Sequence, residues 1–236
     1  MGETSTKTVL TKYTAQNLKF KKIFAYNRTL FAITTDSKLY VCGQDDYGEL
    51  GAGAGTGIFG SSRISKFTQV SNDSNSNSID FSKLVKIESG TNFSALLLDD
   101  GTVYVTGINA SGQLGLSDYN FRSKWTKNTF FDGKSKVVDI SVGDNFIVYL
   151  LENGEVYTSG NNSYGQFGNG TKTTSNTPLK ANISDVKSIS AGASHVVVVK
   201  NDNTAWSYGK GSHGQLGNGR TAQDIVTPQR AYELEK

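Results

Sequence analysis

Short apolar runs alternate with glycine-containing turns along most of the chain, and the same order of runs occurs four times. The central run of a copy is almost entirely apolar, as in 95–98, 147–151 and 196–199. A continuous apolar run of this length, bounded by turns, is typical of a strand that is covered on both faces. The pattern therefore predicts short, buried strands, each with a less apolar strand before and after it.

Each copy is predicted to contain three consecutive strands joined by tight turns. The predicted strands are 20–25, 29–34 and 39–42; 84–88, 93–98 and 102–106; 137–141, 146–151 and 155–159; and 186–190, 195–200 and 204–208. Asp100-Gly101 and Asn153-Gly154 supply the positive φ angles that two-residue hairpins need. A further strand is predicted over residues 9–14.

Edge strands are expected after each hairpin. Pro178 and Pro228 follow the repeated turns at nearly the same distance, and Trp125 occupies this position in the second copy. Proline cannot donate a hydrogen bond within a sheet, so it belongs on an edge strand or at a strand start. Edge strands are placed near five residues, one more than four sheets require: Leu10, Phe67, Thr129, Leu179 and Gln229.

A glycine-rich segment marks each copy most clearly. It consists of a strand ending on glycine, four residues, and a Gly-Gln-Leu-Gly turn or a close variant. The first turn glycines are Gly48, Gly112, Gly165 and Gly214, which are 64, 53 and 49 residues apart. Self-similarity at about 50 residues is the signature of propellers and repeat arrays. We therefore predict an all-β, propeller-like array of four blades.

These segments resemble the repeats of the regulator of chromosome condensation family. The fourth copy matches best, through 191–195 and 214–219, and the first is the most divergent, with Tyr26 and Glu49 in place of the usual Gly and Gln. The resemblance implies a single domain over residues 1–236, with repeats at about 20–70, 81–132, 134–182 and 183–232 and a polar tail at 1–8.

Members of this family typically form seven-bladed propellers, whereas this chain has four repeats. Four blades could close into a small ring, form an open arc whose ends pack on another protein, or join with a second chain. An uncovered end blade exposes apolar surface and strand edges, which natural proteins avoid. We therefore favour a small or incomplete propeller whose ends are covered by partners or by another copy.

Composition narrows the possible functions. The 236 residues carry a net charge of +3 with both signs interspersed, which disfavours nucleic-acid binding. The single Cys42 excludes an intramolecular disulfide framework, and neither zinc spacing nor an apolar run long enough for a membrane span is found. The N-terminus lacks the pattern of a signal peptide. These features favour the cytoplasm or an intracellularly assembled particle.

No combination of residues predicts catalysis, a metal site or a cofactor. His195 is expected to be structural filler, Cys42 a buried small residue, and His213 a surface loop residue. The carboxylate pairs Asp45-Asp46 and Glu152/Glu155 are interpreted as solvated turn acids.

Two loops that break the repeat carry the candidate partner-binding residues, since propellers bind through their loops. One set comprises Tyr119, Phe121, Arg122 and Trp125, and the other Ile58, Phe59 and Arg63. Aromatic and Arg residues of this kind are enriched at interface hot spots. The alternative is that these aromatics fold back and cover a blade.

The sequence thus predicts a non-catalytic propeller that serves as a protein-interaction or structural component of a larger assembly, such as a virion or another multisubunit particle. Its expected partners are other proteins or copies of itself. The family resemblance also implies an alternative, guanine-nucleotide exchange on a small GTPase. A carbohydrate-active enzyme would require carboxylates that converge on a central channel.

Overall fold

Four antiparallel sheets of four strands make up the computed structural model, which describes residues 18–58, 60, 62–221 and 223–231. Blade 1 contains β1 (Phe20–Tyr26), β2 (Thr29–Thr34), β3 (Leu39–Gln44) and β4 (Arg63–Val70). Blade 2 contains β5 (Leu84–Ser89), β6 (Phe93–Leu98), β7 (Val103–Gly107) and β8 (Arg122–Lys127). Blade 3 contains β9 (Val137–Val142), β10 (Phe146–Leu151), β11 (Val156–Gly160) and β12 (Ser175–Lys180). Blade 4 contains β13 (Val186–Ala191), β14 (His195–Lys200), β15 (Ala205–Gly209) and β16 (Ile225–Arg230).

Each blade is a simple meander, in which every strand pairs with the next one along the chain. The predicted hairpin turns are confirmed, with Gly101 and Gly154 at φ of 88° and 79°. Blades 1 and 4 place Ser37 and Asn203 at similar angles of 63° and 67°. The predicted strand over residues 9–14 lies outside the described residues.

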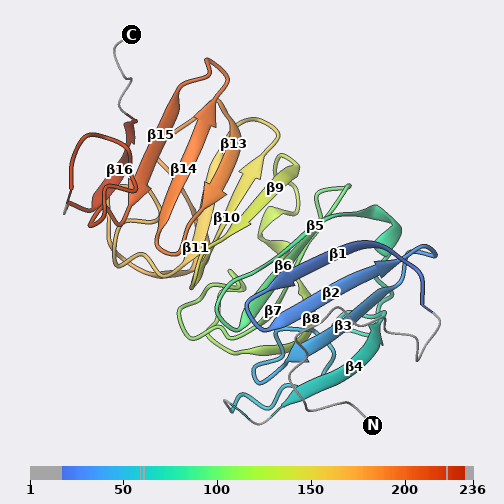
Figure 1. Cartoon of the computed structure of the whole chain (residues 1–236). Coiled ribbons are helices and arrows are strands. Elements are labelled where there is room, and N and C mark those ends of the chain that lie inside the picture. Colours follow the sequence, from blue (N-terminus) through green and yellow to red (C-terminus); the bar gives the residue numbers. More distant parts are fainter. Residues whose placement is uncertain (1–17, 59, 61, 222, 232–236) are drawn as a thin grey trace, which may run out of the picture.

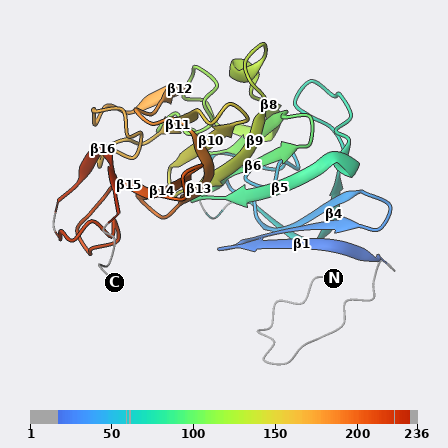
Figure 2. The same cartoon turned by 90° about the horizontal axis from the view of Figure 1, so that it is seen from above.

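The four blades follow one another along an open arc (Figures 1 and 2). The first strands of successive blades contact one another, from β1 through β5 and β9 to β13. Blades 1 and 4 stand at the two ends, and among the described residues the sheets are not joined into a ring by hydrogen bonds. The array is therefore an incomplete propeller, and the predicted all-β, four-bladed architecture is confirmed.

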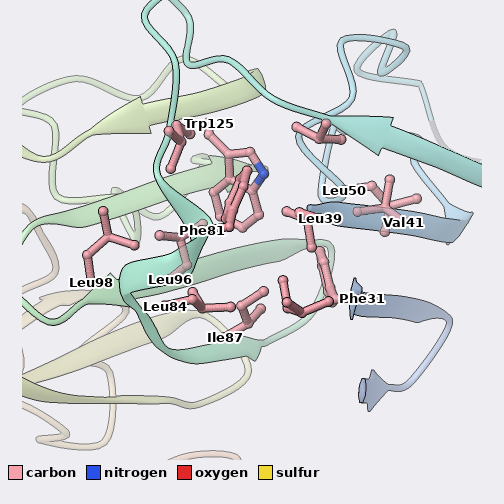
Figure 3. Packing of buried hydrophobic residues seen from close by; sticks show 13 residues of the cluster. Phe31, Leu39, Val41, Leu50, Phe81, Leu84, Ile87, Leu96, Leu98 and Trp125 are labelled. Carbon is pink, nitrogen blue, oxygen red and sulfur yellow. The ribbon is translucent and has the colours of Figure 1, made fainter. Parts of the chain in front are cut away.

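The core lies between the blades. We call the face of a blade toward the preceding blade its leading face, and the face toward the following blade its trailing face. Between blades 1 and 2 these faces meet in one apolar cluster (Figure 3). The trailing face of blade 1 contributes Phe31, Ile33, Leu39, Val41 and Leu50, and the leading face of blade 2 contributes Leu84, Ile87, Leu96, Leu98 and Trp125. Similar clusters join blades 2 and 3 and blades 3 and 4.

The repeated glycine turns lie directly against the following blade. A Cβ added at Gly48 would come within 2.2 Å of Ser123 Cα, and at Gly112 within 2.4 Å of Asn176 Cα. Hydrogen bonds complete the contact, because Thr106 Oγ1 donates to the Gly48 carbonyl at 2.6 Å. The motif therefore recurs because it forms the contact between blades.

The edge strand of blade 2 ends earlier than predicted. It was expected near Thr129, but β8 stops at Lys127 and Thr129 belongs to a short 3-10 helix, η2 (Thr129–Phe131). Asn128 causes the change, since its Oδ1 accepts from Phe130 N at 3.0 Å and its Nδ2 donates to Leu114 O at 3.1 Å. The edge strands near Phe67, Leu179 and Gln229 are confirmed as β4, β12 and β16.

The central strands of the two interior blades are buried on both faces. All residues of β6 and β10 are buried, as predicted, but Val197 and Val199 of β14 are only half-buried. Ile23 of β1 is 68% exposed, although three repeat-equivalent isoleucines are buried. These three are Ile87, Ile140 and Ile189. Ile23 of blade 1 and Val197 and Val199 of blade 4 are therefore more exposed than their equivalents in the other blades, although Ala32 and Thr34 of β2 are buried.

We expect Trp125→Ala to lower the free energy of unfolding by about 3–5 kcal/mol, because it would leave a large cavity between blades 1 and 2. Trp125 is fully buried there, with its ring 6.2 Å from that of Phe31. Urea denaturation measures the change, with Tyr119→Ala as the exposed aromatic control. Equal stability of the two variants would contradict the assigned packing of Trp125.

Candidate protein-interaction site

Two surface loops from different blades lie side by side at the junction of blades 1 and 2. Gly53 N donates to Ser123 O at 2.7 Å, and Ala52 forms an isolated β-bridge with Lys124. A Cβ placed on Gly57 would lie 3.0 Å from the Phe121 ring. The two candidate segments of the sequence, around residues 58 and 121, are thus brought together by the docking of the blades.

Three large apolar side chains of these loops face solvent. Ile58 is 65% exposed, Tyr119 56% and Phe121 42%. We call these three residues the rim patch. Exposed apolar residues are common singly, but three on two adjoining loops form the kind of surface that marks an interaction site.

Asp46 holds the blade 1 loop in place. Its carboxylate accepts hydrogen bonds from Gln44 Nε2 at 2.5 Å, from Gly60 N at 2.7 Å and from Ser62 N at 2.9 Å. Its carbonyl accepts from the amide of Gly57 at 2.8 Å. Because Asp46 bonds the loop on both sides of Ile58, through its carbonyl to Gly57 and through its carboxylate to Gly60 and Ser62, Ile58 is presented from an anchored backbone.

Arg122 holds the blade 2 loop in place in a similar way. Its guanidinium donates to the Asp118 carboxylate at 2.5 Å and to the Asn120 carbonyl at 2.8 Å. Burial raises the pKa of Asp118, but the hydrogen bonds from Arg122 and the Asn120 amide outweigh burial, so the pKa lies below its ordinary value. Arg122 therefore orders the loop that carries Tyr119 and Phe121.

Positive charge adjoins the blade 1 loop. Arg63 is exposed at the start of β4 and lines an open hollow of about 520 Å³ together with Arg28, Gln44 and Ile64. Arg28 Nη1 donates to Gln44 Oε1 at 3.1 Å. Sequence reasoning missed Arg28, although it lies in the β1–β2 turn, where the first repeat departs from the Gly-x-Asn sequence of the second.

The other two candidate residues do not add to this surface. Trp125 is buried between the blades. This agrees with the alternative interpretation, in which the aromatic residues fold back and cover a blade. Phe59 lies outside the described residues. The surface suggested by the described residues therefore comprises the rim patch with Arg63, supported from below by Arg122.

The acids of blade 1 are not solvated, so this expectation was wrong. Asp45 and Asp46 are both fully buried. Asp45 occupies the position of Asn109 in blade 2, and in each case Oδ1 accepts a backbone amide, from Leu50 at 2.9 Å and from Leu114 at 3.0 Å.

The two blades differ in the hydrogen bonding of the second polar atom of this side chain. Asn109 Nδ2 donates to the Asp118 carbonyl at 2.8 Å, whereas Asp45 Oδ2 has no hydrogen-bond partner in the described structure. Burial raises the pKa of Asp45 to about 7, and the charges of Glu49 and Asp46 act in the same direction. The backbone hydrogen bonds that Asp45 accepts act against burial, and the raised pKa means that burial favours the neutral form as pH falls below about 7.

We expect Asp45→Asn to stabilise the protein at pH 8 and to reduce its pH dependence. A carboxyl whose folded pKa is raised gives full stability below its unfolded pKa of about 4, and loses stability as pH rises toward 7. The wild-type loss is expected to be about 2 kcal/mol, measured from thermal melts at pH 5 and pH 8.

Asp46→Asn is the matched control for this substitution. It removes a carboxylate that accepts two backbone amides, Gly60 N and Ser62 N, so it should destabilise the protein at both pH values. Destabilisation by Asp45→Asn at pH 8 would refute the assigned role of Asp45.

The surroundings of His195 and Cys42 indicate structural roles for these two residues. His195 packs against Gly192, and burial lowers its pKa. Cys42 is partly buried, and burial raises the pKa of its thiol. Among the described residues, no group of three or more His, Cys, Asp or Glu side chains is placed to hold a metal ion. In the same part of the chain, no helix has the length and apolar character to cross a membrane.

Comparison with known proteins identifies similar repeats. Two models described as the regulator of chromosome condensation (RCC1) repeat match the chain, one at residues 84–113, 137–166 and 186–215 and the other at 100–150 and 153–199. The human X-linked retinitis pigmentosa GTPase regulator is 34% identical over 136 residues, covering 58% of this chain and 12% of that protein. The Secretion-regulating guanine nucleotide exchange factor of Bos taurus is 29% identical over 137 residues, covering 58% and 27%.

A solved structure shares the fold over nearly the whole chain. Prp20p from Saccharomyces cerevisiae superimposes with a TM-score of 0.73 and 19% identity, covering 93% of this chain and 52% of that chain. The chain thus spans about half the length of this structural neighbour, and about an eighth to a quarter of the two curated relatives.

Proposed function

The chain belongs to the regulator of chromosome condensation repeat family, and from this premise we propose that it is a non-catalytic propeller module that binds another protein. The rim patch is the proposed contact surface. We further propose that the module is a structural component of a larger assembly; the expectation of a virion stays a prediction.

The observation that carries the proposal is the exposure of Ile58, Tyr119 and Phe121 on adjoining, anchored loops. Backbone that is already held by hydrogen bonds, as at Gly60 and Ser62, loses less conformational entropy when a partner binds. Arg63 at the margin favours a partner with an acidic group beside its apolar residues. The partner is thus expected to present an apolar patch bordered by Asp or Glu.

The relatives support an interaction role. The human relative is named a GTPase regulator, and the structure of Prp20p is described together with its binding to Gsp1p and histones. These are properties of those proteins, and they support the proposal that this module also acts by binding proteins.

We expect Phe121→Asp combined with Ile58→Asp to weaken partner binding strongly while the melting temperature changes little. The full chain is used as bait, and proteins that it retains are quantified and then purified for calorimetric titration. Loss of a hot-spot aromatic costs about 2 kcal/mol or more, so the dissociation constant should rise at least 30-fold.

Tyr164→Ala is the matched control, because Tyr164 is also an exposed aromatic but lies in the loop of blade 3. It should bind the purified partner as the wild type does. A partner that binds the double variant and the wild type equally would refute the rim patch as the contact surface.

Guanine-nucleotide exchange remains the second candidate, because the cattle relative is named an exchange factor. We expect no acceleration of labelled GDP release when catalytic amounts of the chain are added to a small GTPase that it binds. The non-catalytic proposal would be overturned if the chain accelerated GDP release and a variant with a substitution in a blade, but with normal stability, did not.

A further inference from the structure

The open hollow of blade 1 is lined by two arginines from different segments. Arg28 lies in the turn between β1 and β2, and Arg63 begins β4. Among the described residues, the lining of this hollow of about 520 Å³ contains neither Asp nor Glu. Two positive charges thus border one space that has the size of a ligand site.

Gln44 lies between the two arginines at the end of β3. Its backbone amide donates to the Arg28 carbonyl at 2.9 Å, and it is the partner of Arg63 in the β3–β4 ladder. Directly opposed residues of antiparallel strands project to the same side of the sheet, with Cβ atoms about 5 Å apart. The ladder therefore places Arg63 beside Gln44. The side chain of Gln44 in turn contacts Arg28, whose Nη1 donates to Gln44 Oε1 at 3.1 Å.

The buried carboxylate of Asp46 fixes the orientation of the Gln44 amide group. It accepts from Gln44 Nε2 at 2.5 Å, so Gln44 Oε1 is turned toward Arg28. The same carboxylate accepts from the amide of Ser62, the residue before Arg63, at 2.9 Å. Both arginines therefore belong to one hydrogen-bonded unit, which is ordered before a ligand binds and so loses less conformational entropy on binding.

Two acids lie close to this unit but are buried. Asp46 accepts the backbone amides described above, and Glu49 Oε2 accepts from Tyr47 N at 2.9 Å. Asp46 and Glu49 are almost fully buried, whereas Arg28 and Arg63 are exposed. The charge that the hollow presents to solvent is therefore positive.

Blade geometry does not explain the two arginines, because the other blades lack them. The backbone hydrogen bond of Arg28 and the ladder position of Arg63 have equivalents in every blade. The equivalents of Arg28 are Asn92, Asn145 and Ser194, and those of Arg63 are Phe121, Thr174 and Asp224. Packing of a blade thus requires a cation at neither position, and the pair is a specific feature of blade 1.

A phosphorylated side chain matches the two arginines in charge and in geometry. A phosphoryl group carries a charge of about −1.5 to −2 at pH 7 and three strong acceptor oxygens, whereas a carboxylate has one charge and two oxygens. Each guanidinium presents its N–H groups as a planar fork that can bind two oxygens. One phosphoryl group can therefore satisfy both arginines, while one carboxylate satisfies a single fork.

We propose that this hollow binds a phosphorylated side chain, with Arg28 and Arg63 donating to the phosphoryl oxygens and Gln44 positioning Arg28. The inference rests on the proposed function in one respect, because the phosphorylated residue is assigned to the partner that contacts the rim patch. Ile58 of that patch lies in the loop that leads into Arg63, so one partner segment can reach both. Phosphorylation of the partner then strengthens the complex.

The test is a titration of the full chain with acetyl-phosphoserine amide at pH 7, followed by NMR at the backbone amides of Gly43, Gln44 and Ile64. Acetyl-aspartate amide is the matched carboxylate probe. We expect saturable shifts at these amides with the phosphorylated probe. The dissociation constant of the carboxylate probe should be at least about 10-fold higher, because it offers fewer charge-assisted hydrogen bonds.

Arg28→Gln and Arg63→Gln should each raise the dissociation constant of the phosphorylated probe at least about 10-fold. Arg63→Lys keeps the charge but loses the planar fork, so its dissociation constant should lie between those of the wild type and Arg63→Gln. Arg220→Gln is the matched control, because Arg220 is also exposed and also donates to a glutamine, Gln223 Oε1 at 3.4 Å, but lies in blade 4. It should bind the probe as the wild type does.

Three results would overturn the proposal. The aspartate probe could bind as tightly as the phosphorylated one, or Arg63→Gln could leave the dissociation constant unchanged. Arg220→Gln could also weaken binding as much as Arg63→Gln, which would indicate a general attraction between opposite charges. Melting curves establish that each variant is folded.

The small probe separates this proposal from the proposed function. It carries no apolar side chain, so Tyr119→Ala should bind it as the wild type does. A partner that binds through the rim patch regardless of its phosphorylation would refute only the phosphoryl site. Normal binding of the probe, together with a partner that binds equally to the wild type and to the rim-patch double variant, would refute only the proposed contact surface.

Discussion

The structure depends on the packing of one apolar sheet face against another. A four-stranded meander satisfies the hydrogen bonds of its inner strands but buries no apolar surface by itself. Each interior blade of this array therefore becomes stable by contributing one face to the blade before it and one to the blade after it. Burying a large apolar side chain contributes about 1.5–3 kcal/mol, and each junction contains about ten of them.

This constraint explains why so much of the fold is predictable from the sequence. Leu96 and Val148 lie in apolar runs because both faces of β6 and β10 are covered. The four turn glycines share a positive φ, and at the first three the next blade also leaves little room for a Cβ. These signals are local and repeated four times. The spacing of apolar and glycine residues along the sequence is sufficient to detect them.

Other features depend on single side chains and were not predictable in the same way. Asn128 ends β8 through hydrogen bonds to Phe130 and Leu114, which hydrophobic periodicity does not describe. The burial of Asp45 could have been inferred by aligning it with Asn109 and Asn162, whose amide groups are also buried. The contact between Gly57 and Phe121 arises from the docking of two blades, so neither loop alone predicts it.

The rim patch is composed of loops from two blades, and this has a thermodynamic consequence. A partner that contacts Ile58 and Phe121 together binds only when blades 1 and 2 are docked. By linkage, such a partner stabilises that junction by RT ln(1 + [L]/Kd), which is about 2.7 kcal/mol at a hundredfold excess over Kd. Among the described residues, blade 1 shares an apolar cluster with one other blade, so its docking gains most from this coupling. Partner binding at the rim patch would then favour the docking of blades 1 and 2, and their docking would favour partner binding.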